Sequence, residues 1–366
     1  MQALVKGAAI GSILGGLLLA GCGRAAIPNS NAGVGSIATT SSTATTSPMA
    51  ALSCSLPVAQ AISGPTPPKT GFVALPSGTF QADATGAMVT EPGSTRTKTI
   101  QTPVLYGDGG ATYDRAFKRW LPVAQAQVSA DGSAYVYTRE ASPTQLRNEI
   151  HLVTVSTATD QVIYDQGAYH ALSYQPEGIY LTHHLSGADG SNGLWLLDPA
   201  TRAVKSYPAS VHASWISIAG GSAWTYSTDG NRFGSTTFAR LDLSSGAETT
   251  WFTATSSVQI PQSESGSKSV RAIGFDANAH PIVEVYTMGG NVTPEIWLLS
   301  APSQATQVSG LHLAQFTPPP GITDSHGAWV VGSDGIYLYK SESFERVASA
   351  PPGWSTPDYS VAGSCA

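Results

Sequence analysis

The sequence is poor in charged residues. Only 11% of its 366 residues are Asp, Glu, Lys or Arg, whereas an ordinary soluble domain carries about 25%. Lys and Arg number 18 against 24 acidic residues, which gives a formal net charge of −6, and no basic cluster is present. Because a nucleic-acid-binding protein needs a basic face to neutralise phosphates, we set that class of partner aside. The scarcity of charge also argues against a helical bundle, which would be rich in Ala, Glu, Lys and Leu.

Cysteine is scarce as well, and the first of the three cysteines has a distinctive setting. Cys22 follows an apolar run from Ile10 to Leu19, which is too short to span a bilayer comfortably and has the length of a signal-peptide core. The run ends in Leu19-Ala20-Gly21-Cys22, which resembles the bacterial lipobox, where small residues precede the cysteine that is acylated. We therefore predict a lipoprotein signal peptide over residues 1–21 and lipid attachment at Cys22. The alternative is an ordinary signal peptide with a chance cysteine.

The segment after Cys22 has the composition of a flexible tether. Residues 22–50 contain one charged residue and no aromatic residue, and they are rich in Ser, Thr and Ala. Such a chain cannot bury enough apolar area to offset its conformational entropy. We predict a lipidated tether over 22–50 and a globular domain over 51–366. This arrangement would hold the domain at a bacterial cell membrane, on the extracytoplasmic side.

The other two cysteines, Cys54 and Cys365, lie at the two ends of the predicted domain. An exported chain enters an oxidising compartment, so the pair predicts one disulfide that would bring both ends together. The alternative is two unrelated buried thiols. With all three cysteines assigned in this way, none is left for a Cys-rich zinc site.

The domain carries a repeated pattern of short strands. From about residue 70 to 350, alternating apolar runs are separated by turns rich in Gly, Asp, Asn, Pro and Ser. One unit has an Asp-Gly hairpin at Ala130-Asp131-Gly132-Ser133 and a second turn at Ala158-Thr159-Asp160. Turns of the second kind recur near residues 116, 158, 200, 245, 303 and 342. We infer six units, each a four-stranded meander.

Six such units are typical of a β-propeller. We predict an all-β fold, a six-bladed β-propeller of four-stranded antiparallel blades, whose ring closes at the predicted disulfide. A pair of β-sandwiches is the alternative, but it does not explain evenly spaced copies. Because blades bury their faces against one another, large aromatic residues are expected in the core. The tryptophans assigned to this role are Trp195, Trp224, Trp251, Trp297 and Trp329.

The repeats resemble the TolB-like six-bladed propellers of bacterial envelope proteins and, more loosely, the streptogramin lyase type. The resemblance covers residues 70–350 in pattern and rests on the turns at Asp131-Gly132, Asp198-Pro199 and Asp242-Leu243-Ser244-Ser245-Gly246. Such turns occur in many propellers. The resemblance therefore implies the fold and an envelope setting, and it transfers no functional residue.

The sequence contains none of the common catalytic signatures. A nucleophile elbow, a His-Glu-x-x-His motif, a phosphate-binding loop and a dinucleotide fingerprint are all missing from it. Asp189-Gly190-Ser191-Asn192 comes nearest to a calcium loop, but we interpret it as an ordinary polar loop. We predict no metal and no cofactor, and we leave catalytic residues unassigned.

Candidate binding residues follow from the propeller prediction, because ligands of propellers usually lie on one face around the channel mouth. Polar residues recur at matching positions before successive inner hairpins, and we take four as candidate channel-mouth residues: Gln125, His170, His212 and Arg271. The longer loops expected on the same face contribute Arg139, His183, His184, Asp229 and Arg232. For each histidine, the plainer interpretation is a hydrogen-bonded residue of a polar rim.

Two functions are compatible with this pattern. The first is a monomeric, lipid-anchored binding or scaffolding module that captures an envelope protein or a small molecule. The second is a lyase or hydrolase acting on an envelope glycan or a cyclic peptide, with His170 or His212 as general base and Arg271 stabilising the developing anion. The lack of a paired-carboxylate or nucleophile signature favours the first.

Overall fold

The computed structural model describes residues 52–60, 69–83, 110–142, 147–184, 191–207, 214–227, 237–254, 268–287, 293–313, 321–355 and 358–366. All of them belong to a compact unit of residues 49–366. Cys22, the tether, His212, Asp229 and Arg232 lie outside the described residues. Within the described ranges, the regular structure consists of 25 strands and one short 3-10 helix. No helix there has the length and apolar character needed to cross a bilayer.

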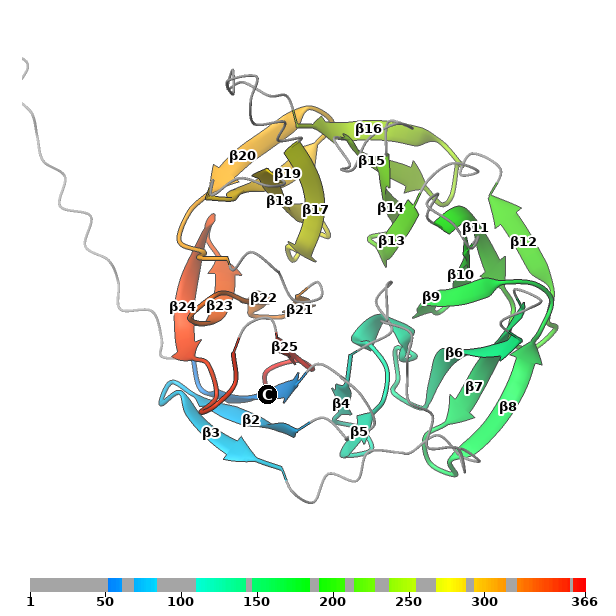
Figure 1. Ribbon diagram of the computed structural model, residues 1–366, viewed down its shortest axis with the longest axis horizontal. Coiled ribbons are helices and arrows are strands. Elements are labelled where there is room, and N and C mark those ends of the chain that lie inside the picture. The colour runs from blue at the N-terminus through cyan, green and yellow to red at the C-terminus, as the bar shows by residue number, and fades with distance from the viewer. Residues whose placement is uncertain are drawn as a thin grey trace, which may run out of the picture. The chain divides into compact units, whose positions relative to one another are not determined.

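The strands form seven antiparallel sheets, which we call sheets A to G in chain order (Figure 1). Sheet A has the strand order β25 (Tyr359–Val361), β1 (Cys54–Gln60), β2 (Thr70–Leu75), β3 (Thr79–Ala82). Sheet B pairs β4 (Thr112–Asp114) with β5 (Arg119–Leu121), and the 3-10 helix η1 (Gln125–Gln127) follows. Sheet C contains β6 (Ala134–Ser142), β7 (Arg147–Thr154) and β8 (Thr159–Tyr164).

The remaining four sheets are four-stranded meanders. Sheet D contains β9 (Tyr169–Gln175), β10 (Gly178–His184), β11 (Ser191–Leu197) and β12 (Val204–Tyr207). Sheet E contains β13 (Ser214–Ala219), β14 (Ser222–Ser227), β15 (Thr237–Asp242) and β16 (Glu248–Thr253). Sheet F contains β17 (Lys268–Phe275), β18 (Pro281–Thr287), β19 (Glu295–Ala301) and β20 (Gln304–Val308). Sheet G contains β21 (Ile322–Asp324), β22 (Gly327–Val331), β23 (Gly335–Lys340) and β24 (Ser343–Ser349).

Successive sheets contact one another around a ring. Sheet C contacts sheet D through β6 and β9, D contacts E through β11 and β13, and F contacts G through β17 and β22. Sheet G in turn contacts sheet A through β22 and β25. In Figure 1 the first strand of each meander lies toward the centre and the last strand lies outside. The prediction of an all-β propeller is therefore confirmed.

The predicted count of six blades is not confirmed, because the described residues form seven sheets. The sheet that the sequence pattern missed is sheet A, which has its outer hairpin at Ser77–Gly78, between β2 and β3. Its innermost strand, β25, comes from the other end of the chain. A search for consecutive four-stranded units cannot detect such a sheet, since its strands are not consecutive.

The two ends of the domain meet in sheet A, where β25 pairs antiparallel with β1 and places Val361 opposite Val58. A disulfide joins Cys54 to Cys365, with the two Cα atoms 5.5 Å apart. The predicted pairing of these cysteines is thus confirmed, and we call this junction of β1, β25 and the disulfide the closure seam.

Neighbouring sheets bury their apolar faces against each other. At the closure seam, Trp329 of sheet G is fully buried in one cluster with Leu56, Val58 and Tyr359 of sheet A. Between sheets E and F, Trp224 and Trp251 of sheet E, whose rings meet edge to face with centroids 4.8 Å apart, are buried in one cluster with Val283 of sheet F. Of the five predicted core tryptophans, three are buried, whereas Trp195 and Trp297 are only partly buried at the margins of their clusters. Cross-sheet packing of this kind holds each blade in place.

Candidate functional site

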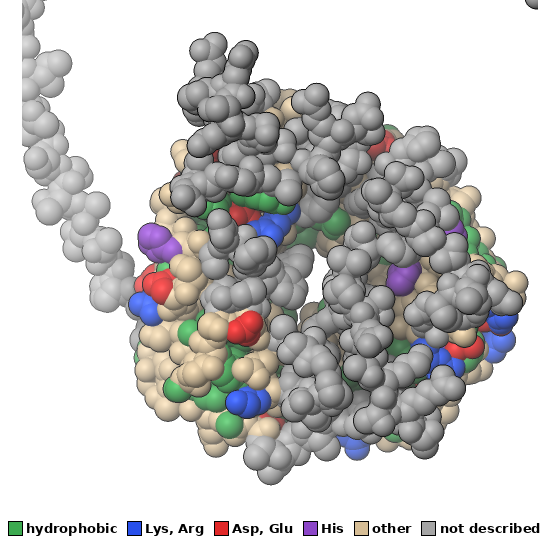
Figure 2. Space-filling model, viewed as in Figure 1, with side chains coloured by type: hydrophobic (Ala, Val, Ile, Leu, Met, Phe, Trp, Pro, Cys, Tyr) green, Lys and Arg blue, Asp and Glu red, His purple; other side chains and the backbone are tan. Residues whose placement is uncertain are grey.

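The face of the ring in Figure 2 carries scattered basic, acidic and histidine side chains among the described residues. His170 lies at the second position of β9, the innermost strand of sheet D. Its Nε2 is 3.0 Å from the side-chain Nδ2 of Asn148, and the same Nδ2 is 3.2 Å from the carbonyl oxygen of Tyr169. Because an amide nitrogen donates, Nε2 of His170 accepts in this arrangement, and the ring carries its proton on Nδ1. Asn148, from sheet C, therefore fixes the orientation and tautomer of His170.

Arg271 lies on β17, the innermost strand of sheet F. Its Nε donates to Oε2 of Glu284 at 2.5 Å, and its guanidinium carbon lies 5.0 Å from the ring centroid of Tyr286. The Glu284 side chain is only 1% exposed, whereas that of Arg271 is 27% exposed. A buried carboxylate and an aromatic face thus hold the guanidinium in one orientation while part of it stays accessible.

The position of Gln125 differs from the prediction. We expected it to begin the innermost strand of its blade, but it lies exposed in η1, and sheet C has only three strands. The cause is the buried neighbour Gln127, whose Oε1 accepts from the backbone of Ala124 and whose Nε2 donates to the carbonyl of Ala171 in sheet D. These bonds fold residues 125–127 into a 3-10 turn in place of a strand.

The face-loop prediction was wrong for Arg139, His183 and His184, because all three lie in strands. Arg139 is in β6 opposite Glu149 of β7, so the predicted loop shrinks to a short connection. His183 and His184 end β10 and pair with Asn192 and Ser191 of β11. The His183 ring also meets the ring of Tyr169 edge to face at 5.2 Å. Cross-strand pairing has extended both hairpins beyond the point where the polar sequence indicates a loop.

A network of charged residues on sheet C was not predicted. The His151 side chain is 3% exposed, with Nδ1 2.8 Å from Oδ1 of Asp160 and Nε2 3.2 Å from Oε2 of Glu149. Arg139 donates to the same Glu149 oxygen from both Nε and Nη2. The Tyr137 hydroxyl donates to Oδ2 of Asp160 at 2.7 Å, and the Tyr137 ring stacks on His151 with centroids 4.5 Å apart. Every polar group of this network has a partner.

The same contacts shift the titration of Glu149. The hydrogen bond from Arg139 is the main reason that the pKa of Glu149 lies below its usual value, and the hydrogen bond from His151 adds to the effect. The sequence held one signal for this network. Tyr137 and Arg139 alternate on β6, and Glu149 and His151 alternate on β7, so each pair shares one face of its strand.

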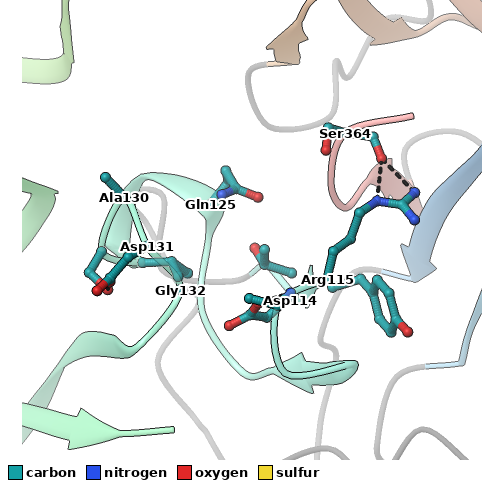
Figure 3. A pocket seen from close by; sticks show the side chains of 12 residues that line it. Asp114, Arg115, Gln125, Ala130, Asp131, Gly132 and Ser364 are labelled. Carbon is teal, nitrogen blue, oxygen red and sulfur yellow. Dashed lines mark hydrogen bonds between the residues drawn. The ribbon is translucent and has the colours of Figure 1, made fainter. Parts of the chain in front are cut away.

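A cavity of about 190 Å³ lies beside the closure seam (Figure 3). Its lining comes from the β4–β5 turn, η1, the turn before β6 and the C-terminal segment. The polar lining residues include Asp114, Arg115, Gln125, Asp131 and Ser364. Gln125 is thus the one predicted channel-mouth residue that lines this cavity among the residues that the structure describes.

Asp114 was not predicted as a site residue. Its Oδ1 accepts from the backbone amides of Ala116 and Phe117, as an aspartate does in an Asx turn. Its Oδ2 is buried and has no hydrogen-bond partner. Burial is the main cause that raises the pKa of Asp114, and the negative charge of Asp131 adds to it. The Asx turn could be recognised from sequence, but the unpartnered oxygen could not.

Comparison with known proteins gives a likeness at the level of the fold. No protein-family profile matches the sequence, and no curated protein matches it. Among solved structures, TolB from Acinetobacter baumannii is 13% identical, with a TM-score of 0.42 over 84% of this chain and 67% of that chain. A protein from Lactobacillus plantarum is 13% identical, with a TM-score of 0.48 over 81% of this chain and 97% of that one.

The β-propeller domain of the Trilobed protease from Pyrococcus furiosus is similar too. It is 11% identical, with a TM-score of 0.42 over 80% of this chain and 86% of that chain. At such identities no functional residue can be transferred. The chain resembles TolB and other β-propeller proteins in its fold.

Proposed function

We propose that this chain is a binding module, an extracytoplasmic β-propeller lipoprotein that captures an envelope protein or a small molecule at the face that carries His170 and Arg271. The observation that supports the proposal is that His170 and Arg271, which lie on the innermost strands of sheets D and F, are both held in place by protein side chains. Arg271 is held by Glu284, and His170 is held by Asn148. Donors and acceptors that are oriented before binding lose little entropy when a ligand arrives, which favours recognition.

The same contacts suit recognition better than proton transfer. A general base must exchange its proton with substrate or solvent, and it needs a clear approach to do so. The ring nitrogens of the buried His151 are both close to carboxylates, and Nε2 of His170 faces an amide. His170, the one described histidine of the two considered as general base, is therefore engaged by a protein partner, as is the buried His151. For this reason binding remains our proposal in preference to the alternative of a glycan or cyclic-peptide lyase or hydrolase.

We also propose that lipid on Cys22 holds the module at the membrane. The support comes from the sequence Leu19-Ala20-Gly21-Cys22 and from the Cys54–Cys365 disulfide, since disulfides persist in exported proteins. Changing Cys22 to Ala should release the protein from the membrane fraction and abolish its labelling with palmitate. Unchanged labelling would remove the lipid anchor from the proposal.

The binding face is tested by crosslinking the native protein in cells and quantifying what co-purifies with it. The variant with both His170→Gln and His212→Gln should lose at least tenfold of the captured species, a change of about 1.4 kcal/mol, with an unchanged melting temperature. The control is His280→Gln, because His280 is partly exposed like His170 and is likewise held by a side chain, that of Asp276, but lies in the turn between β17 and β18. Equal capture by both variants would contradict the proposed face, and turnover of an envelope glycan by the wild type would favour the enzyme.

A further inference from the structure

The cavity beside the closure seam contains a buried acceptor that the protein itself leaves unused. Asp114 is 6% exposed, and its Oδ2 has no hydrogen-bond partner although its Oδ1 accepts from two backbone amides. A buried carboxylate oxygen without a partner is costly, because it has lost its hydration and gained nothing in return. A ligand that enters the cavity with a hydrogen-bond donor could supply the missing partner of this oxygen.

The cation next to Asp114 in the sequence does not supply that donor. Arg115 points away toward the C-terminal segment (Figure 3). Its Nε and Nη2 donate to the carbonyl oxygen of Ser364 at 3.0 and 2.7 Å, and Nη2 also donates to the carbonyl oxygen of Ser55 at 2.5 Å. Arg115 therefore braces the closure seam, and among the described residues no cation pairs with Asp114.

A second carboxylate adds negative charge to the same cavity. Asp131 is exposed, and its Oδ1 accepts from the hydroxyls of Ser129 and Ser133 and from the Ser133 backbone amide. These hydrogen bonds, led by the Ser133 hydroxyl, lower the pKa of Asp131 to about 2, so it is ionised at neutral pH. Among the lining residues that the structure describes, Arg115 is the one cation. With Asp114 ionised as well, the two carboxylates outnumber it, and these residues are complementary to a ligand of one positive charge.

The group that covers Asp114 is small. Gly132 lies directly over the carboxylate, so that a Cβ built on it would be 2.6 Å from Oδ2. Gly132 belongs to a turn whose residues Ala130 and Asp131 are exposed. The residue of this turn that contacts Oδ2 therefore has no side chain of its own.

We propose that this cavity binds a primary ammonium group, either of a free amine or of a lysine side chain, with Asp114 as its principal acceptor and Asp131 as its second negative charge. An ammonium carries one charge and three donors, which matches the excess charge and the unused acceptor. A divalent cation fits less well. Calcium needs six or more oxygen ligands, but Oδ1 of each aspartate already accepts hydrogen bonds from the protein. The positive charge of Arg115, which lines the same cavity, also disfavours a divalent cation. This site is independent of the binding face proposed above.

The test uses n-butylammonium as the probe and n-butanol as its neutral counterpart of similar size. Backbone amide resonances of the wild-type protein should shift at Ala116 and Gly132 with butylammonium and stay in place with butanol. The affinity should fall as the pH is lowered through the pKa of Asp114, because a proton competes for the same oxygen. Cadaverine and a short lysine-containing peptide then distinguish the two sources, and the tighter of the two identifies the natural ligand class.

Asp114→Asn should weaken butylammonium binding at least tenfold. The matched control is Asp198→Asn, because Asp198 caps an Asx turn through the same contacts, to Ala200 and Thr201, outside the cavity. Three results would each overturn the proposal. They are equal butylammonium binding by Asp114→Asn and wild type, binding of butanol as tight as that of butylammonium, and tighter binding of Ca²⁺ with shifts at the same amides. If Asp114→Asn fails to fold, the wild-type shifts decide alone, and shifts confined to other turns would overturn it.

Discussion

The backbone amide of Cys365 donates to Oδ2 of Asp324 at 2.8 Å. Asp324 ends β21, so this bond ties the last residues of the chain to sheet G, while the disulfide ties them to sheet A. Arg115 of sheet B adds a third tie through the Ser364 carbonyl. Three sheets thus hold the same short segment, and the ring does not depend on a single contact for its closure.

The disulfide should nevertheless contribute measurably to stability. Changing both Cys54 and Cys365 to Ser should lower the free energy of unfolding by about 2–4 kcal/mol, because the unfolded chain is no longer crosslinked. The variant should still fold, since β25 keeps its pairing with β1. Chemical denaturation of the variant beside oxidised and reduced wild type checks this. An unfolded variant, or one as stable as the oxidised protein, would contradict the role assigned to the bond.

The His151 network should be important for stability because it is buried. Replacing His151 by Ala leaves Asp160 without its imidazole partner, so we expect a loss of about 3 kcal/mol. Arg139→Ala is the internal comparison. Its side chain is 42% exposed, and loss of an exposed ion pair costs less than about 1 kcal/mol. Equal losses in the two variants, measured by chemical denaturation, would argue against a buried network.

The stability of the protein should depend on the ionisation of Glu149. Its pKa in the folded protein lies below the ordinary value of 4.5, mainly because of the hydrogen bond from Arg139. The stabilisation is therefore complete above pH 4.5 and is lost as the pH falls through the lower folded value. The gap in stability between wild type and Arg139→Ala should shrink over this acid range. A gap that is constant from neutral pH to pH 3 would contradict the assignment.

Alanine substitutions at two glycines distinguish the stability cost of a strained backbone from the cost of a steric clash. Gly132 and Gly246 both have a φ of +72°, but a Cβ on Gly132 would meet the Asp114 carboxylate at 2.6 Å, whereas one on Gly246 has nothing within 4 Å. Gly246→Ala should cost about 1 kcal/mol from its left-handed conformation alone. Gly132→Ala should cost at least about 1 kcal/mol more. Thermal unfolding of both variants measures the difference, and equal melting temperatures would mean that the Asp131–Gly132 turn moves freely away from Asp114.

Features encoded by nearby residues could be predicted from the sequence. The Asp131-Gly132 hairpin has the expected positive φ at its glycine, and the outer turns at Asp198 and Asp242 use the aspartate side chain to accept backbone amides, as turn aspartates do. The disulfide was predicted from the cysteine count together with the compartment expected for an exported chain. In each case the necessary information lies within a few residues or in the composition of the chain.

Features that depend on distant partners could not be predicted in this way. Gln125 left the expected inner strand because Gln127 bonds to Ala171 of the next sheet. His170 received its orientation from Asn148, which belongs to a different sheet. The unpartnered oxygen of Asp114 depends on the place of Gly132 in the following turn. None of these relationships leaves a periodic signal in the sequence, because each links segments whose spacing is set by the ring.

The strand order of sheet A also has a consequence for the synthesis of the protein. During synthesis, β1 is made first among the strands that the structure describes, yet the partner on its inner edge, β25, is made last. Until residue 361 has emerged, β1 presents an open row of hydrogen-bonding groups, and such edges recruit strands of other chains. A chain cut short before Tyr359 would keep that edge permanently. Premature termination therefore leaves β1 as an unpaired edge at which aggregation can begin.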